Sequence, residues 1–117
     1  MATLTLYHNP RCSKSREALA LLETHGADFT LRRYLDDPLS LTELQSLAAR
    51  LKGPIRDLVR SNEDEWKALA LDTPSDEQRL QAIAQHPRLL QRPLLDRGDR
   101  AIIGRPPEAI MALLDEA

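Results

Sequence analysis

Residues 3–34 read TLTLYHNPRCSKSREALALLETHGADFTLRRY, and this stretch decides the fold. Residues 3–7 alternate polar and apolar side chains, as do residues 29–34, which predicts two short strands that each bury one face. Between them, residues 13–25 place apolar side chains at helical spacing and stop at Gly26, the usual residue after a helix end. A strand, a helix and a second strand of these lengths predict two parallel strands in one sheet.

The middle of the chain carries helical patterns instead of alternation. Ser40-Leu41-Thr42-Glu43 resembles a capping box, in which the serine and glutamate side chains bind the free backbone N–H groups at a helix start. Apolar residues then recur at helical spacing, and Gly or Pro separates some of the segments. The sequence predicts a helical block at about residues 40–86, with helices over residues 40–52, 55–60, 64–70 and 75–85.

The last part of the chain returns to strand-like patterns. Residues 93–96 and 101–104 are short apolar runs, and Arg97-Gly98-Asp99-Arg100 between them is typical of a hairpin turn. Pro106-Pro107-Glu108 then opens a helix over residues 109–116. The order of elements is therefore βαβ, an inserted helical block, and ββα.

Composition agrees with one helix-rich domain. The chain has 117 residues, 42% of them hydrophobic, and Leu and Ala predominate while Val occurs once and Trp, Tyr and Phe together number four. Its 16 Lys and Arg against 18 Asp and Glu give a net charge of −2, which argues against nucleic acid as a partner. We expect an α/β protein with a four-stranded mixed sheet and a single domain over residues 1–117.

The sequence also argues against a membrane partner. No window approaches the ~18 uninterrupted apolar residues that a spanning helix needs. The first six residues, MATLTL, carry neither a basic segment nor a long apolar one, so they do not resemble a secretion signal. We therefore expect a cytoplasmic protein.

Cys12 is the only cysteine, which excludes an internal disulfide, a four-thiolate zinc site and a Cys-x-x-Cys redox pair within this chain. It lies between the first predicted strand and the first predicted helix, directly before the helix begins. The unpaired N–H groups and the dipole of a helix N-terminus favour a thiolate. Arg11, Lys14 and His8 add positive charge or hydrogen-bond donors nearby. The alternative is a buried, inert cysteine, because free cysteines are commonly buried.

This position also predicts an anion site. The loop after the first strand of a βαβ unit opens at the edge where open α/β sheets place their ligands, so a disulfide substrate or a tetrahedral oxyanion could bind there. A tyrosine-phosphatase loop needs Arg six residues after the cysteine, and here that residue is Ala18. Arg16 comes earlier and is equally explained as a solvated residue of the first helical turn.

The segment from His8 to Arg16, HNPRCSKSR, resembles the nucleophile segment of the glutaredoxin-coupled arsenate reductases, which read H-N-P-x-C-x-x-S-R. The similarity covers essentially the whole chain. It continues through Tyr34-Leu35, Pro38, Glu43-Leu44, Leu58-Val59-Arg60, Glu65-Trp66, Leu69-Ala70-Leu71, His86-Pro87, Gln91-Arg92-Pro93 and Gly104-Arg105-Pro106. The resemblance implies a thioredoxin-like fold.

The resemblance also implies roles for particular residues. Cys12 would be the nucleophile, and Arg60, Arg92 and Arg105 would close around the oxyanion, whose acceptor oxygens suit planar guanidinium groups. Pro93 would be the cis-proline that faces the cysteine in thioredoxin-like folds. Taken singly, Arg60 is better explained as an exposed helix end, and Arg92 and Arg105 as loop residues fixed by the prolines that follow, so their binding role depends on the resemblance.

Further residues are implied around the sulfur. His8, Ser15 and Arg16 would stabilise the thiolate, and Asn9 would shape the loop. For His8 a purely structural hydrogen bond is an equal alternative. His25 and His86 look structural and form no ligand cluster, so we predict no metal.

The reaction implied by the resemblance is the reduction of arsenate to arsenite through a thiol–arsenate adduct on Cys12. Glutathione would be a co-substrate and glutaredoxin the protein partner, with no bound cofactor. A lone cysteine requires such an external thiol if turnover is to continue.

Two alternatives remain open. The first is a regulator similar to Spx, which shares this fold and binds the α-subunit of RNA polymerase, although Ser15 here stands where those proteins commonly carry a second cysteine. The second is a paralogous thiol transferase of unknown substrate, because a fold alone does not determine a substrate.

Overall fold

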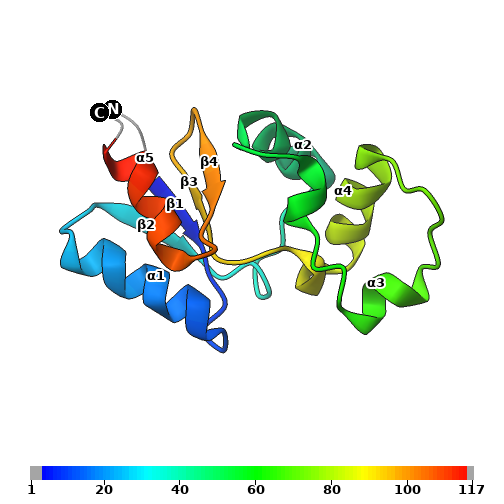
Figure 1. The fold of residues 1–117 in the computed structure, drawn as a ribbon, viewed down its shortest axis with the longest axis horizontal. Helices are drawn as coiled ribbons and strands as arrows, with labels where there is room; N and C mark the ends of the chain where they lie inside the picture. The colour runs from blue at the N-terminus through cyan, green and yellow to red at the C-terminus, as the bar shows by residue number, and fades with distance from the viewer. Residues whose placement is uncertain (1–3, 116–117) are drawn as a thin grey trace.

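The computed structural model describes residues 4–115 and contains a four-stranded sheet in the order β2-β1-β3-β4 (Figure 1). The central strand β1 (Leu4–Tyr7) pairs in parallel with β2 (Phe29–Arg32) and antiparallel with β3 (Leu94–Asp96). Strands β3 and β4 (Ala101–Ile103) form an antiparallel hairpin. The predicted α/β class and the mixed four-stranded sheet are confirmed.

Helix α1 (Ser13–Thr24) connects the two parallel strands. Its C-cap residue is His25, after which Gly26 takes a φ of 70°, a left-handed conformation that glycine adopts at little cost. Its buried side chains are Ser15, Ala18 and Leu22. The helix thus covers one face of the sheet, and its first residue immediately follows Cys12.

The two faces of the sheet bury two different hydrophobic clusters. On one face, Leu6 and Leu95 pack with α1 and with the C-terminal segment formed by the 3₁₀ helix η3 (Pro107–Ile110) and α5 (Met111–Asp115). On the other face, Tyr7 and Leu94 belong to a larger cluster that includes the helical block. Neighbouring strand residues point to opposite faces, which explains this division.

The helical block lies beside the sheet and lengthens the molecule to 43 × 27 × 23 Å (Figure 1). It consists of α2 (Leu41–Arg50), the 3₁₀ helix η1 (Ile55–Leu58), α3 (Asp64–Ala68), α4 (Asp76–Gln85) and the 3₁₀ helix η2 (Pro87–Leu89). The predicted capping box at Ser40 and Glu43 is present, with hydrogen bonds of 3.0 and 3.1 Å. Glu43 also pairs with Arg32 of β2, and these interactions lower the pKa of its carboxyl group to about 2.

Several predicted bounds were wrong. The second strand ends at Arg32 rather than at residue 34, because the N–H groups of Asp36 and Asp37 both donate to the Arg33 carbonyl and turn the chain. The helix predicted over residues 55–60 is the 3₁₀ helix η1 and stops at Leu58, because the next residue pairs with another segment. The predicted final helix begins as the 3₁₀ helix η3. Thr3 and Glu116, at the ends of two predicted elements, lie outside the described residues.

Two further features of the structure are the peptide bonds before two prolines and the lengths of the helices. The peptide bond between Arg92 and Pro93 is cis, as the resemblance implied, and the bond between Arg105 and Pro106 is also cis. Within residues 4–115, no helix is long and apolar enough to cross a membrane.

Candidate active site

The loop between β1 and α1 is closed by hydrogen bonds of its own residues. Asn9 Oδ1 accepts from the Arg11 backbone N–H at 3.0 Å, and the Asn9 carbonyl accepts from the Cys12 N–H at 3.0 Å. The Asn9 N–H in turn donates to the Ser15 hydroxyl at 3.3 Å. These bonds fold the loop over the first turn of α1, so Asn9 shapes the loop in the structure.

Cys12 is the N-cap residue of α1 and its side chain is 7% exposed. Burial by itself raises the pKa of the Cys12 thiol. This effect is outweighed by a hydrogen bond from the Ser15 backbone N–H, by the Arg92 charge and by the Lys14 backbone N–H, so that the pKa of Cys12 is lowered overall. The thiol is therefore more easily ionised than an ordinary cysteine, although it is nearly buried.

Ser15 acts on the sulfur and on the loop through different atoms. Its backbone N–H stabilises the sulfur anion, and its hydroxyl oxygen accepts from the Asn9 N–H. The serine side chain is fully buried and so braces the loop against the helix.

Arg92 is the residue before the cis-proline Pro93, and its side chain approaches Cys12 from the β3 side. Two of its guanidinium nitrogens, Nε and Nη1, are buried and have no hydrogen-bond partner among residues 4–115. Buried polar groups in folded proteins almost always have a partner, and an unpaired buried charge is costly. A cation held in this way next to a thiol of lowered pKa is suited to a bound anion.

Arg60 reaches the same region from the helical block. An isolated antiparallel bridge joins Val59 to Leu90, and the Arg60 N–H donates to the Leu89 carbonyl at 2.8 Å. This pairing brings Arg60 next to the segment that carries Arg92. Burial and then repulsion from Arg92 lower the pKa of the Arg60 guanidinium, while Glu63 pairs with it at 2.5 Å.

A pocket of about 600 Å³ lies between these groups. It is lined by Asn9, Arg11, Tyr34, Leu35, Arg60, Glu63, Pro87, Arg88 and Arg92. Four of these side chains are arginines and one is a carboxylate, so the pocket is basic. The structure therefore brings Arg60, Arg92 and the Cys12 loop together.

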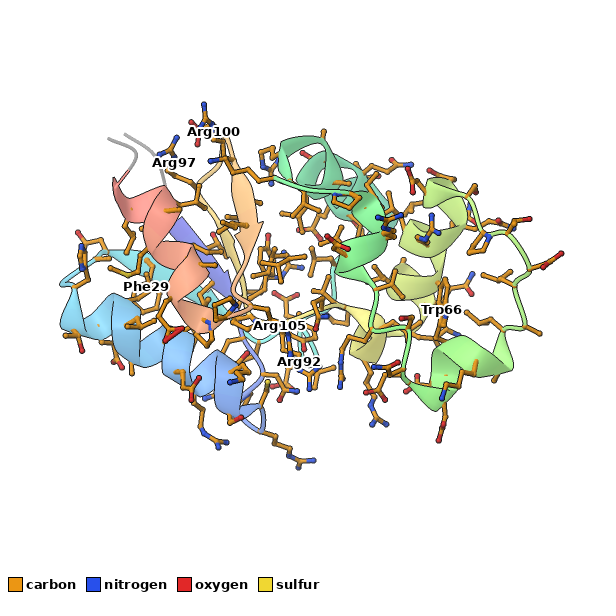
Figure 2. All side chains as sticks on the ribbon, viewed as in Figure 1. Phe29, Trp66, Arg92, Arg97, Arg100 and Arg105 are labelled. Carbon is orange, nitrogen blue, oxygen red and sulfur yellow. The ribbon has the colours of Figure 1, made fainter. Side chains whose placement is uncertain are left out.

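Arg105 is placed differently from the other two arginines implied by the resemblance. Its side chain is exposed, and its Nε donates to the Arg92 carbonyl at 2.9 Å. Figure 2 shows Arg92 and Arg105 next to each other where the sheet meets the helical block. Arg105 lines a second cavity, of about 710 Å³, together with Gln91. In the structure Arg105 thus contacts the Arg92 backbone and does not line the pocket beside Cys12.

His8 and Arg16 also take positions that the sequence did not indicate. His8 is 3% exposed, its Nδ1 has no hydrogen-bond partner within the described part of the chain, and burial followed by the charges of Arg33 and Arg16 lowers its pKa. These effects favour the neutral imidazole. The Arg16 guanidinium donates to the Pro10 carbonyl at 3.0 Å, so it ties the loop to the helix.

Tyr34 is a pocket residue to which sequence reasoning gave no role. It follows the shortened strand β2 and is 1% exposed. Its apolar ring fits the predicted strand pattern, so its hydroxyl was not expected in the site. Among residues 4–115 there is no group of three or more His, Cys, Asp or Glu side chains that could hold a metal ion.

The fold and the site together define a thioredoxin-like domain with one activated cysteine, a cis-proline segment and a basic pocket. A family model described as the ArsC family matches residues 7–113. The chain belongs to the ArsC family.

The relatives agree in sequence and in structure. The chain is 42% identical over 115 residues to a protein named arsenate reductase from Haemophilus influenzae, covering 96% of this chain and 99% of that protein. It is 43% identical over 117 residues to an arsenate reductase from Neisseria meningitidis, covering 97% and 100%. The solved arsenate reductase from Vibrio cholerae superposes with a TM-score of 0.87 at 38% identity, covering 95% of this chain and 97% of that one. The thioredoxin-like fold is confirmed.

Proposed function

We propose that this protein is an arsenate reductase that uses Cys12 as its nucleophile. The names of the relatives support arsenate as the substrate. One structural observation supports the chemistry most directly: Arg92 places buried, unpaired guanidinium nitrogens beside a thiol of lowered pKa. An oxyanion bound there would accept those hydrogen bonds and meet the attacking sulfur.

The first step forms a sulfur–arsenic bond and breaks an arsenic–oxygen bond. The Cys12 thiolate attacks arsenate, and the leaving oxygen departs as water after it takes up a proton. Arsenic keeps its oxidation state in this step. Arg92 and Arg60 would stabilise the negative charge on the remaining oxygens.

The reduction itself needs two electrons, and the chain has one thiol. We infer that glutathione supplies the second thiol: two thiols become one disulfide, and the two electrons released reduce the arsenic to arsenite. Glutaredoxin would then resolve the mixed disulfide on Cys12. A reduced cysteine of this kind requires a reducing compartment, which favours the cytoplasm.

The experiment is an arsenate-dependent assay with glutathione, glutaredoxin and glutathione reductase, followed through NADPH oxidation. We expect turnover by the wild type and none by Cys12→Ser, because a serine hydroxyl does not ionise at neutral pH. Ser13→Ala, at the exposed neighbouring position, is the control and should retain activity. Turnover that survives Cys12→Ser would refute the proposed nucleophile.

Omissions from the same assay, a binding measurement and other substrates separate the alternatives. Omission of glutathione or of glutaredoxin should abolish turnover, and activity with either omitted would refute the proposed reductant. Tight binding to the RNA polymerase α-subunit without turnover would favour the Spx-type regulator. Turnover of another oxyanion in preference to arsenate would favour the paralogous transferase.

A further inference from the structure

We propose that the Tyr34 hydroxyl is a neutral hydrogen-bond donor to the oxyanion, acting between the Arg60 and Arg92 guanidinium groups. This inference depends on the proposed function for the identity of the anion. It adds an uncharged contact to a pocket that otherwise offers mainly positive charge.

The ring of Tyr34 is held in one place by the core. Tyr34 is 1% exposed and belongs to the hydrophobic cluster on the helical-block face of the sheet. It borders a narrow apolar crevice lined by Leu39, Ile83, Pro87 and Leu90. A ring fixed on this side leaves its hydroxyl a defined position, which a binding group needs.

The same side chain also lines the basic pocket of about 600 Å³, together with Arg60 and Arg92. The charges of these two arginines lower the pKa of the Tyr34 hydroxyl and an ionised Cys12 raises it, so the hydroxyl lies within electrostatic reach of all three groups. The hydroxyl is therefore among the very groups that would surround an oxyanion attacked by Cys12.

The hydroxyl proton is available for such a contact. The Asn9 side-chain amide lowers the pKa of Tyr34, as a hydrogen-bond donor to the hydroxyl oxygen does, while Asn9 Oδ1 accepts from the Arg11 N–H at 3.0 Å. The Tyr34 oxygen is the acceptor in that interaction, which leaves its own O–H to be donated elsewhere. An anion in the pocket supplies the acceptor.

The hydroxyl also stays protonated. Burial raises the pKa of Tyr34, and the neighbouring arginines and the Asn9 hydrogen bond only partly oppose this effect. A neutral hydroxyl can donate to an anion, whereas a phenolate would repel it. The two arginines thus supply charge, and Tyr34 supplies a directed donor.

The test measures anion binding without chemistry. In a Cys12→Ser background, which cannot form the adduct, arsenate affinity is measured by isothermal titration calorimetry at pH 7, with inorganic phosphate as a second probe. Tyr34→Phe keeps the ring and removes the donor, and we expect the dissociation constant for arsenate to rise about 10-fold, the usual loss for a hydrogen bond to a charged group.

Tyr7→Phe is the matched control, because it removes the only other tyrosine hydroxyl. Tyr7 is also buried, but Arg32 lies over its ring at 5.9 Å and its hydroxyl interacts with Asp96 rather than with the pocket arginines. We expect its dissociation constant to stay within about 2-fold of the parent. Equal affinities for the Tyr34→Phe and Tyr7→Phe proteins would overturn the proposal.

A second measurement tests whether the Tyr34 hydroxyl acts on the Cys12 sulfur and not on the anion. With Cys12 intact, the pH midpoint of Cys12 alkylation should be the same in Tyr34→Phe and in the wild type. A shifted midpoint with unchanged anion affinity would show that the hydroxyl acts on the thiol, and would overturn the proposal. A protein that binds arsenate but does not reduce it would refute the reductase and leave the Tyr34 comparison valid. A parent that binds neither anion would refute both.

Discussion

At the scale of single residues, the reactivity of Cys12 depends on a balance between burial and nearby donors. Burial disfavours the thiolate, and the Ser15 N–H, the Arg92 charge and the Lys14 N–H together overcome it. The Ser15 and Lys14 contributions come from backbone N–H groups at the start of α1, which every residue except proline has, whatever its side chain; the Arg92 side chain contributes both its charge and a hydrogen bond. Arg92 is therefore the side chain through which the lowered pKa can be tested.

Two substitutions of Arg92 should separate the effect of its positive charge from the effect of its planar donor geometry. Arg92→Lys keeps a positive charge but loses the planar pair of donors, so we expect kcat/KM for arsenate to fall by about 10- to 100-fold, the loss of one or two charge-assisted hydrogen bonds. Arg92→Met should in addition raise the pH at which Cys12 is half alkylated, because it removes a positive charge that stabilises the Cys12 thiolate and lowers the pKa of Cys12.

Arg33→Lys is the control for this pair, because Arg33 is exposed and does not line the pocket. It should leave both kcat/KM and the alkylation midpoint close to the wild type. An Arg92→Met protein whose thiol still titrates like the wild type would contradict the assigned role of the Arg92 charge.

At the scale of elements, the end of β4 positions the segment that carries Arg92. The Gly104 N–H donates to the Pro93 carbonyl at 2.8 Å, and a Cβ atom on Gly104 would lie 2.8 Å from Pro93 Cγ and 3.0 Å from Ile110 Cγ2. The first distance is shorter than real Cβ atoms show, and the second is tighter than nine in ten real Cβ contacts. Only glycine therefore allows β4 to approach Pro93 this closely.

We expect Gly104→Ala to displace Pro93 and with it Arg92. Overpacking of this kind costs about 1–3 kcal/mol of stability, and the displaced guanidinium should lower kcat/KM by more than the loss of folded protein explains. The measurements are urea unfolding and arsenate turnover on the same preparations.

Gly26→Ala provides a control that loses stability without touching the site. Its φ of 70° makes alanine unfavourable by about 1 kcal/mol, and a Cβ there meets nothing within 4 Å. Its kcat/KM should match the wild type. Equal activity in both glycine variants would show that Gly104 does not position Arg92.

At the scale of the whole molecule, the proposed active site lies where the sheet and the helical block meet. Cys12 and Arg92 belong to the sheet half, and Arg60 belongs to the block. Two ion pairs connect the two parts directly: Arg32 of β2 pairs with Glu43 of α2, and Arg50 of α2 donates to Asp96 of β3 at 2.6 and 3.1 Å, where the Asp96 side chain is only 9% exposed. The position of the block should therefore depend on these pairs.

We expect Asp96→Ala to destabilise the protein by about 2–3 kcal/mol, because it leaves a partly buried guanidinium without its carboxylate.

Trp66, in the block (Figure 2), is the single tryptophan, so its fluorescence follows the block while far-UV circular dichroism follows all helices. If residues 1–117 form the single domain predicted, both signals should change at one urea concentration in the wild type.

Asp99→Ala is the control, since Asp99 pairs with Arg97 at the exposed hairpin turn. Its unfolding midpoint should lie near the wild-type value. Two separate transitions in the wild type would contradict the single cooperative unit.

The sequence by itself determined the features that depend on neighbouring residues. Alternation placed the strands, Gly26 ended α1, and the pairing of Ser40 with Glu43 started α2, because strand faces, caps and turns are local in the chain. Cys12 was placed at a helix N-terminus for the same reason. These predictions used segments of a few residues, and the structure confirmed them, except that the second strand ends at Arg32 and not at residue 34.

Only the tertiary structure decided which side chains meet at the thiol. The bridge between Val59 and Leu90 brings Arg60 beside Arg92, and no local pattern encodes that pairing. The same is true of the neutral His8, of the hydrogen bond from Arg105 to the Arg92 carbonyl, and of the Tyr34 hydroxyl in the pocket. The shift of a group's pKa depends on burial and on charges that folding brings together. Whether a buried group lacks a hydrogen-bond partner also depends on its neighbours in the folded protein. Neither property can be deduced until distant segments have packed.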